Sequence, residues 1–369
     1  MKYKRMPIEA ESPEQLGYDT LDCNLAESSV HDLTFGELGL DLRKVSLSYG
    51  DHLGKPELRE LIASAHKGLR AGDVLLTQGA ASALFIVATS LLSKKDRLAV
   101  MFPNYATNIE TPGAIGCTID RVELKFEDDF KLDIPSLEKK IKKNTRYISI
   151  TYPHNPTGVT IGKKELLELI RIAEKKNIFL LVDETYRELN RAEEVPLAAS
   201  LSNNAISISS LSKAYGLPGI RMGWLITKNK SLQELFLAAK EQIFVCNSVA
   251  DEEIAYGFLL KKEKFAKKIN ERVLQNFAVV DKWMGSSKYL EWVRPGGGVV
   301  CFPRMRHPAT INIAEFYSLL NKKYKTLVGP GHWFGMPRSY MRIGYGWPSA
   351  AEFKRGLSNI QRALAEASK

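Results

Sequence analysis

Residues 205–226 read AISISSLSKAYGLPGIRMGWLI, which places Lys213 directly after an alternating apolar and serine run typical of a strand. Most lysines are solvated surface charges, but this one follows Ser210 and Ser212. The glycines and the proline after it predict a loop that brings Arg221 back to the same strand end. A lysine, two hydroxyls and an arginine suit an anion bound beside a reactive amine. The stretch therefore predicts a cofactor site at Lys213.

Outward from this stretch, short apolar runs alternate with amphipathic helical patterns. The predicted strands are 74–76, 98–101, 147–150, 179–182, 205–211 and 224–226. Helical patterns occupy 80–92, a segment from Tyr105, and 163–176. Such alternation is typical of an α/β fold, in which a mostly parallel sheet is covered by helices on both faces.

The pattern changes after Trp224, where helical segments run to about Gly285. Beyond them lie strand-like runs at 299–302 and 340–343, a helical pattern at 311–320 and a C-terminal helix from Ala350. A chain of 369 residues exceeds the size at which single cores usually divide. We expect a large cofactor-binding domain over 46–285 and a smaller α+β domain made of 1–45 and 286–369.

Composition excludes several classes of function. The net charge of +10 comes from lysine doublets dispersed over helical patterns, which favours solvated faces over nucleic-acid binding. No apolar run is long enough for a membrane span or a signal peptide, so we expect a cytoplasmic protein with no membrane partner. The four cysteines show no close spacing, so neither a metal site nor a disulfide framework is expected.

Polar residues follow other predicted strands, at the edge where α/β sheets bind ligands. Ala80 and Ala81 open a helix after Gly79, so their N–H groups can face an anion, although such turns often use glycine without a ligand. Tyr105 follows the next strand and suits either an aromatic ligand or the core.

Two further strand ends carry amide and carboxylate groups. Prolines in the loop YPHNPTG at 152–158 present Asn155 rigidly, although an ordinary turn can show the same pattern. Asp183 ends the apolar run FLLV, and Tyr186 follows three residues later. A carboxylate there is costly unless it meets a cation or caps the next helix. The members of this set complement one another as parts of one site.

The motifs PHNPTG, DETY, SLSK and GIRMGW, in this order, resemble the class I/II aminotransferases of the aspartate aminotransferase superfamily. A Tyr49…Gly54…Leu58-Arg59 pattern upstream and YMRIGYG at 340–346 extend the resemblance over most of the chain. It implies fold type I and the cofactor pyridoxal 5'-phosphate.

The resemblance implies a role for each residue. Lys213 would form the Schiff base with the cofactor and then move protons as an acid and base. Asp183 would pair with the ring nitrogen, Asn155 and Tyr186 would bond to the ring oxygen, and Tyr105 would stack on the ring. The expected phosphate ligands are Ala80, Ala81, Ser210, Ser212, Arg221 and, from the other subunit of a homodimer, Tyr49.

The substrates implied are an L-amino acid and a 2-oxo acid. Arg342 would bind the α-carboxylate as a bidentate pair, with Asn155 and Ala26 nearby. The entrance is expected at 24–27, while His332 and Trp333 suit either the substrate pocket or a packed aromatic turn.

No motif selects one reaction. Transamination is the expected activity, and no second arginine marks a dicarboxylate substrate. The same fold supports elimination by a lyase, or a cyclase or oxidase acting on a basic amino acid. A regulatory protein that binds the cofactor without turnover would usually carry a DNA-binding domain, for which the N-terminal segment is too short.

Overall fold

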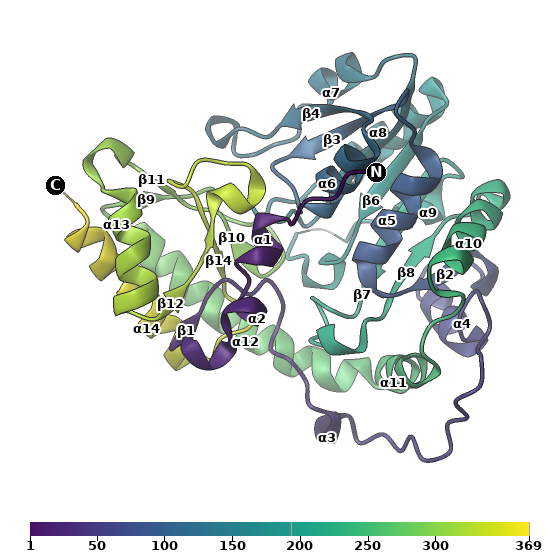
Figure 1. The fold of residues 1–369 in the computed structure, drawn as a ribbon, viewed down its shortest axis with the longest axis horizontal. Coiled ribbons are helices and arrows are strands. Elements are labelled where there is room, and N and C mark those ends of the chain that lie inside the picture. The colour runs from purple at the N-terminus through teal and green to yellow at the C-terminus, as the bar shows by residue number, and fades with distance from the viewer. Residues whose placement is uncertain (193, 369) are drawn as a thin grey trace.

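A seven-stranded sheet forms the centre of the larger of two lobes (Figure 1). The computed structural model describes residues 1–192 and 194–368. The strand order is β2-β8-β7-β6-β5-β3-β4, in which β8 runs antiparallel to both neighbours and the other pairs are parallel. The strands are β2 (Val74–Thr77), β3 (Arg97–Phe102), β4 (Thr118–Glu123), β5 (Thr145–Thr151), β6 (Phe179–Asp183), β7 (Ala205–Ser210) and β8 (Gly223–Ile226). The predicted α/β class and mostly parallel sheet are confirmed.

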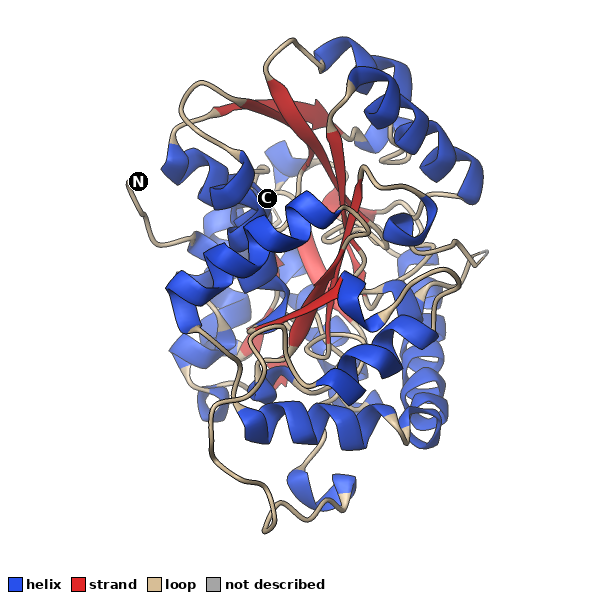
Figure 2. Ribbon diagram, turned by 90° about the vertical axis from the view of Figure 1, so that its right-hand side faces the viewer, coloured by secondary structure: helices blue, strands red, loops and turns tan. Residues whose placement is uncertain are grey.

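Helices cover both faces of this sheet (Figure 2). Side chains alternate between the faces, so Ile206 and Ile208 pack with one set of helices while Leu180 and Val182 pack with the other. The first set is α5 (Gly79–Leu91), α6 (Thr107–Ile115) and α10 (Lys230–Phe244). The second set is α7 (Ile134–Lys140), α8 (Lys163–Lys176) and α9 (Ala198–Leu201). Further helices α4 (Pro56–Ser64) and α11 (Val249–Leu259) pack beside β2 and β8.

The smaller lobe is reached through the 24-residue helix α12 (Lys262–Gly285) (Figure 1). Its strands form one three-stranded sheet and two pairs, and the N-terminal strand β1 pairs with β12. The strands are β1 (Cys23–Asn24), β9 (Leu290–Glu291), β10 (Val300–Cys301), β11 (Arg304–Met305), β12 (Thr326–Leu327), β13 (Gly329–Pro330) and β14 (Met341–Gly344). The helices are α1 (Pro7–Ala10), α2 (Pro13–Leu16), α13 (Ile313–Ser318) and α14 (Ala350–Glu366). The domain boundaries at 46 and 285 stay a prediction.

One segment between the lobes extends away from the body of the chain. It carries the short helix α3 (Phe35–Leu38) and runs below α12 and α11 in Figure 1. Leu47 and Tyr49 on this segment are 84% and 85% exposed. Large apolar side chains with this exposure indicate a surface that another molecule can cover.

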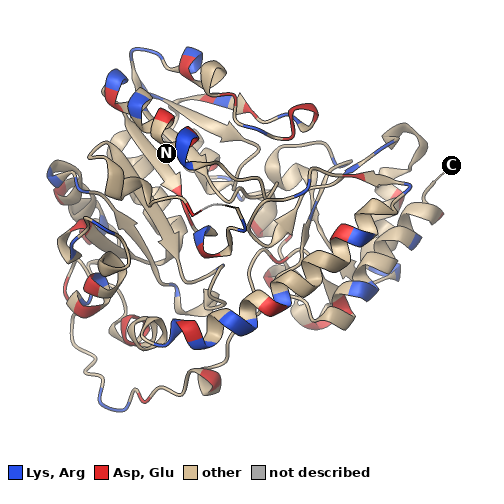
Figure 3. Ribbon diagram, turned by 180° about the vertical axis from the view of Figure 1, so that it is seen from behind, with Lys and Arg blue, Asp and Glu red and all other residues tan. Residues whose placement is uncertain are grey.

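The carboxyl ends of β5, β6 and β7 meet the first turn of α5 at one edge of the sheet. Gly223 allows β8 to approach the first turn of α5 closely, because a Cβ on Gly223 would lie 2.5 Å from the carbonyl carbon of Gly79. Elsewhere basic and acidic residues are interspersed along the helices (Figure 3). Within the described ranges no helix is long and apolar enough to cross a membrane.

Candidate active site

A cavity of about 300 Å³ lies at this edge, between the sheet, the N-terminal segment and β14. Its wall brings together nearly all of the predicted site residues: Ala26, Ala80, Ala81, Tyr105, Asn155, Asp183, Tyr186, Ser210, Ser212, Lys213, Arg221 and Arg342. Trp333 also borders it. Tyr49 and His332 lie outside this wall.

Asp183 lies at the end of β6 and is 5% exposed. Its Oδ1 accepts hydrogen bonds from the Thr185 hydroxyl (2.6 Å) and the Thr185 N–H (3.2 Å). Burial raises the pKa of Asp183, and bonds from Thr185 and Asn108 oppose that rise. No ion pair links this carboxylate to a cation among the described residues. A cationic group of a ligand would therefore stabilise the Asp183 carboxylate.

The first turn of α5 and Arg221 form an anion cradle. Gly79 has a φ of +77° and opens the helix, so the N–H groups of Ala80 and Ala81 lie at its positive end. A Cβ on Gly79 would lie 2.7 Å from Nη2 of Arg221, so the guanidinium packs directly against this turn. Nη1 of Arg221 donates to the Pro218 carbonyl at 2.7 Å.

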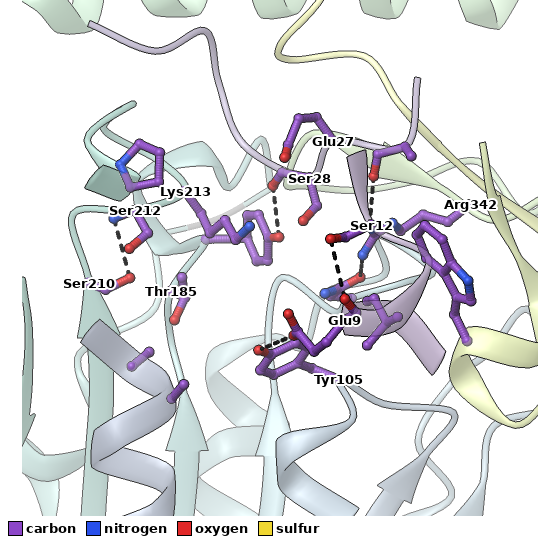
Figure 4. A pocket seen from close by; sticks show the side chains of 18 of the residues that line it. Glu9, Ser12, Glu27, Ser28, Tyr105, Thr185, Ser210, Ser212, Lys213 and Arg342 are labelled. Carbon is purple, nitrogen blue, oxygen red and sulfur yellow. Dashed lines mark hydrogen bonds between the residues drawn. The ribbon is translucent and has the colours of Figure 1, made fainter. Parts of the chain in front are cut away.

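Lys213 extends into the cavity from the loop after β7 (Figure 4). Its carbonyl accepts from the N–H of Val30 at 2.9 Å, which ties the loop to the N-terminal segment. Ser210 and Ser212 border the cavity beside it, and both are buried. In the part of the chain that the structure describes, the Lys213 amine has no hydrogen bond. The amine is free to react with a ligand.

Arg342 is 3% exposed and is held by two neighbours. Nη1 donates to Oδ1 of Asn155 at 3.0 Å, and Nη2 donates to the Ala26 carbonyl at 2.7 Å. Nε is buried without a hydrogen-bond partner. Burial lowers the pKa of Arg342, which shows how little solvent stabilises its charge. An anionic group in the cavity would accept a hydrogen bond from Nε and would stabilise the positive charge of Arg342.

The two tyrosines of the wall also have partners. The Tyr186 hydroxyl donates to the Ser28 carbonyl at 2.8 Å, and the Tyr105 hydroxyl donates to Oε1 of Glu9 at 3.2 Å. Burial raises the pKa of Tyr105. These hydrogen bonds fix both hydroxyl groups on the wall of the cavity. The contacts of Tyr105 and Tyr186 with the cofactor ring stay predictions.

Comparison with known proteins agrees with this geometry. A family model described as aminotransferase class I and II matches residues 40–360. The chain belongs to this aminotransferase family. An aspartate aminotransferase of Pyrococcus horikoshii is 28% identical over 86% of this chain and 83% of its own. Capreomycidine synthase of Streptomyces vinaceus is 28% identical over 92% and 89%.

Among solved structures, a PLP-dependent aminotransferase from Streptococcus suis has a TM-score of 0.92. It is 25% identical, and both chains are covered in full. The protein is thus a pyridoxal-phosphate-dependent aminotransferase. Its residues fit this cofactor, because a buried Asp183 without a cation suits the ring nitrogen and the cradle at Gly79 and Arg221 suits the phosphate.

The contribution of the first residues to this aminotransferase cavity is not predicted by the sequence pattern. Glu9, Ser12 and Glu14 line it, together with Thr185. Glu11 holds the N-terminal segment in place by accepting from Nε1 of Trp333 at 2.7 Å. Helices α1 and α2 have four residues each, too few for a helical period to be visible. Only the Pro residues that begin them, Pro7 and Pro13, could have signalled these turns.

The loop that presents Asn155 is fixed by a buried histidine. Nε2 of His154 lies 2.9 Å from the Pro103 carbonyl, and Nδ1 lies 2.8 Å from the Thr157 hydroxyl. The carbonyl can only accept, so Nε2 carries the proton and the neutral ring accepts at Nδ1. Burial lowers the pKa of His154 from 6.5 to about 4.

This pKa predicts that acid destabilises the protein through His154. Below pH 6.5 the unfolded chain binds a proton that the folded chain takes up only near pH 4, so stability falls across this window. From pH 7 to pH 5 the native protein should lose about 2 kcal/mol more than the His154→Gln variant, whose other groups titrate alike. Urea unfolding at both pH values measures this difference, and equal losses in the two proteins would refute it.

Proposed function

We propose that this aminotransferase moves an amino group between an L-amino acid and a 2-oxo acid, with Lys213 as the residue that bonds to the cofactor. The observation that carries the proposal is the shared wall of one cavity. It holds an amine without a partner at Lys213, a buried carboxylate without a cation at Asp183, and a buried guanidinium with a free Nε at Arg342.

Bound pyridoxal phosphate supplies an electron sink that stabilises negative charge on the substrate Cα. Asp183 would hold a proton on the ring nitrogen, and the same ion pair would offset the cost of burying Asp183. Asn155 and Tyr186 would bond to the ring oxygen, and Tyr105 would pack on the ring face. The first turn of α5, with Ser210, Ser212 and Arg221, would bind the phosphate.

Lys213 then acts as the acid and base at the substrate. Its flexible stem lets the amine move a proton to and from Cα while Arg342 holds the α-carboxylate. Two points of attachment, at the amine and the carboxylate, fix the orientation of the Cα–H bond. The bonds from Arg342 to Asn155 and Ala26 restrict the guanidinium before substrate arrives.

A cyclisation is the second candidate reaction, because a solved structure described as the PLP-dependent cyclase OrfR is 26% identical and covers 99% of this chain, with a TM-score of 0.89. An amino-acid panel with and without a 2-oxo acid separates the candidates. Amino transfer requires the acceptor, an elimination releases ammonia without it, and a cyclisation yields a product that keeps its nitrogen. Absence of any acceptor-dependent reaction would contradict amino transfer.

Replacing Lys213 tests the proposed role of this amine. The Lys213→Ala variant should lose turnover by at least about 1,000-fold, since both the bond to the cofactor and the proton carrier are removed. Lys228→Ala is the matched control, because Lys228 lies outside the cavity and bonds to the Ser200 carbonyl. Turnover rates measured with saturating cofactor test this expectation. A Lys213→Ala variant as fast as native protein would exclude Lys213 as the residue that bonds to the cofactor.

We further propose that two copies pair and that Tyr49 reaches the phosphate site of the partner. The exposure of Leu47 and Tyr49 on the extended segment supports this, since both side chains are left uncovered in one chain. We also propose a cytoplasmic location, where four free cysteines remain reduced.

The dimer is tested by placing a charge on the extended segment. Native protein should sediment at about twice its chain mass of 41.4 kDa. Leu47→Asp should shift the equilibrium towards the single chain, because a carboxylate would be buried at the contact. A native protein that sediments as a single chain at micromolar concentration would refute the pairing.

A further inference from the structure

The active-site cavity contains more carboxylates than the proposed function uses. Three cationic side chains border it, and each has a role: Lys213 for the cofactor, Arg221 for the phosphate and Arg342 for the substrate α-carboxylate. Asp183 is used by the ring nitrogen. Glu9, Glu14 and Glu27 then remain on the wall without a cation assigned to them.

The three glutamates differ in burial and in hydrogen bonding. Glu9 accepts the hydrogen bond from Tyr105, which fixes one of its oxygens. Glu14 is exposed, and Glu27 is half-buried. Among the described residues neither of these two carboxylates has a hydrogen bond or an ion pair. Burial raises the pKa of Glu27, Lys213 and Arg342 oppose that rise, and Glu14 adds to it.

The position of Glu27 relates it to the substrate. Its neighbour Ala26 accepts the hydrogen bond from Nη2 of Arg342, whose buried Nε has no partner. That unsatisfied atom marks where an α-carboxylate binds. In Figure 4, Glu27 lies on one side of the space between Lys213 and Arg342, and Glu9 and Tyr105 lie on the other. A side chain leaving Cα in this space therefore passes carboxylates.

This charge arrangement disfavours an acidic substrate. A second substrate carboxylate would enter a space bordered by three glutamates, and among the described residues of a single chain no further cation borders the cavity to receive it. Like charges brought together without solvent weaken binding strongly. A positively charged side chain would instead give Glu27 and Glu14 the partner that they lack.

We propose that the substrate is an L-amino acid with a positively charged side chain, a guanidinium or an amine, and that Glu27 and Glu14 bind this charge. The inference rests on the proposed function, because it assumes that Lys213 and Arg342 hold the two ends of the same substrate. Glu27 acts as the inner contact and Glu14 as the contact at the mouth of the cavity.

Pairs of amino acids of similar size, one with a cationic and one with a neutral side chain, measure the effect of the side-chain charge on binding. Holoenzyme is titrated with L-arginine and with its neutral counterpart L-citrulline, and with L-lysine and L-norleucine, following the visible spectrum of the cofactor. L-Aspartate is the acidic comparison. We expect each cationic ligand to bind at least about tenfold more tightly than its neutral counterpart, and aspartate to bind most weakly.

Variants of Glu27 and Glu14 test whether these two side chains cause the preference for cationic ligands. Glu27→Gln changes charge with little change in shape, and Glu14→Gln lies on the surface where folding is unaffected. Together they should reduce the preference for arginine over citrulline to about twofold or less. Glu60→Gln, an exposed residue of α4 outside the cavity, is the matched control and should keep the native preference.

Each result has a distinct meaning. A native protein that binds cofactor and reacts with amino acids, yet prefers aspartate or treats arginine and citrulline alike, overturns the inference and leaves the proposed function standing. A preference that survives the double variant overturns the assignment to Glu27 and Glu14. A protein that takes up no cofactor, or whose spectrum responds to no amino acid, contradicts the proposed function itself.

Discussion

The Asp183 carboxylate, buried at the end of β6 without a cation beside it, is the constraint on which the site depends. A charge in this position is costly unless a ligand supplies the partner. The sheet places it where β5 and β7 also end, so Asn155 and Lys213 arrive at the same edge. Asp183 would hold the ring nitrogen of the cofactor, with Lys213 and the first turn of α5 on the wall of the same cavity.

Charges of both signs border the cavity. The helix end and Arg221 provide positive potential that suits a phosphate, and Arg342 provides positive potential that suits a carboxylate. Glu27 and Glu14 provide negative potential on the same wall. This combination of charges allows one ligand to bind by several groups of different sign, which is a source of specificity as well as affinity.

Much of this architecture could be predicted from the sequence, because buried strands are apolar and their ends carry polar residues in a particular order. The helix at 163–176 was predicted with the bounds that α8 has, since its period and charges are strong. Strand β4 was not predicted, because it is an edge strand in which only Val122 is buried. The N-terminal part of the cavity was also missed. Its position depends on tertiary contacts, such as Glu11 with Trp333, which leave no periodic pattern.

Reductive trapping of the cofactor tests the central claim most directly. The holoenzyme is treated with borohydride, digested, and analysed by peptide mass spectrometry. We predict one equivalent of pyridoxyl group per chain, attached to Lys213. A group distributed over surface lysines, or attached to a single lysine other than Lys213, would contradict the account.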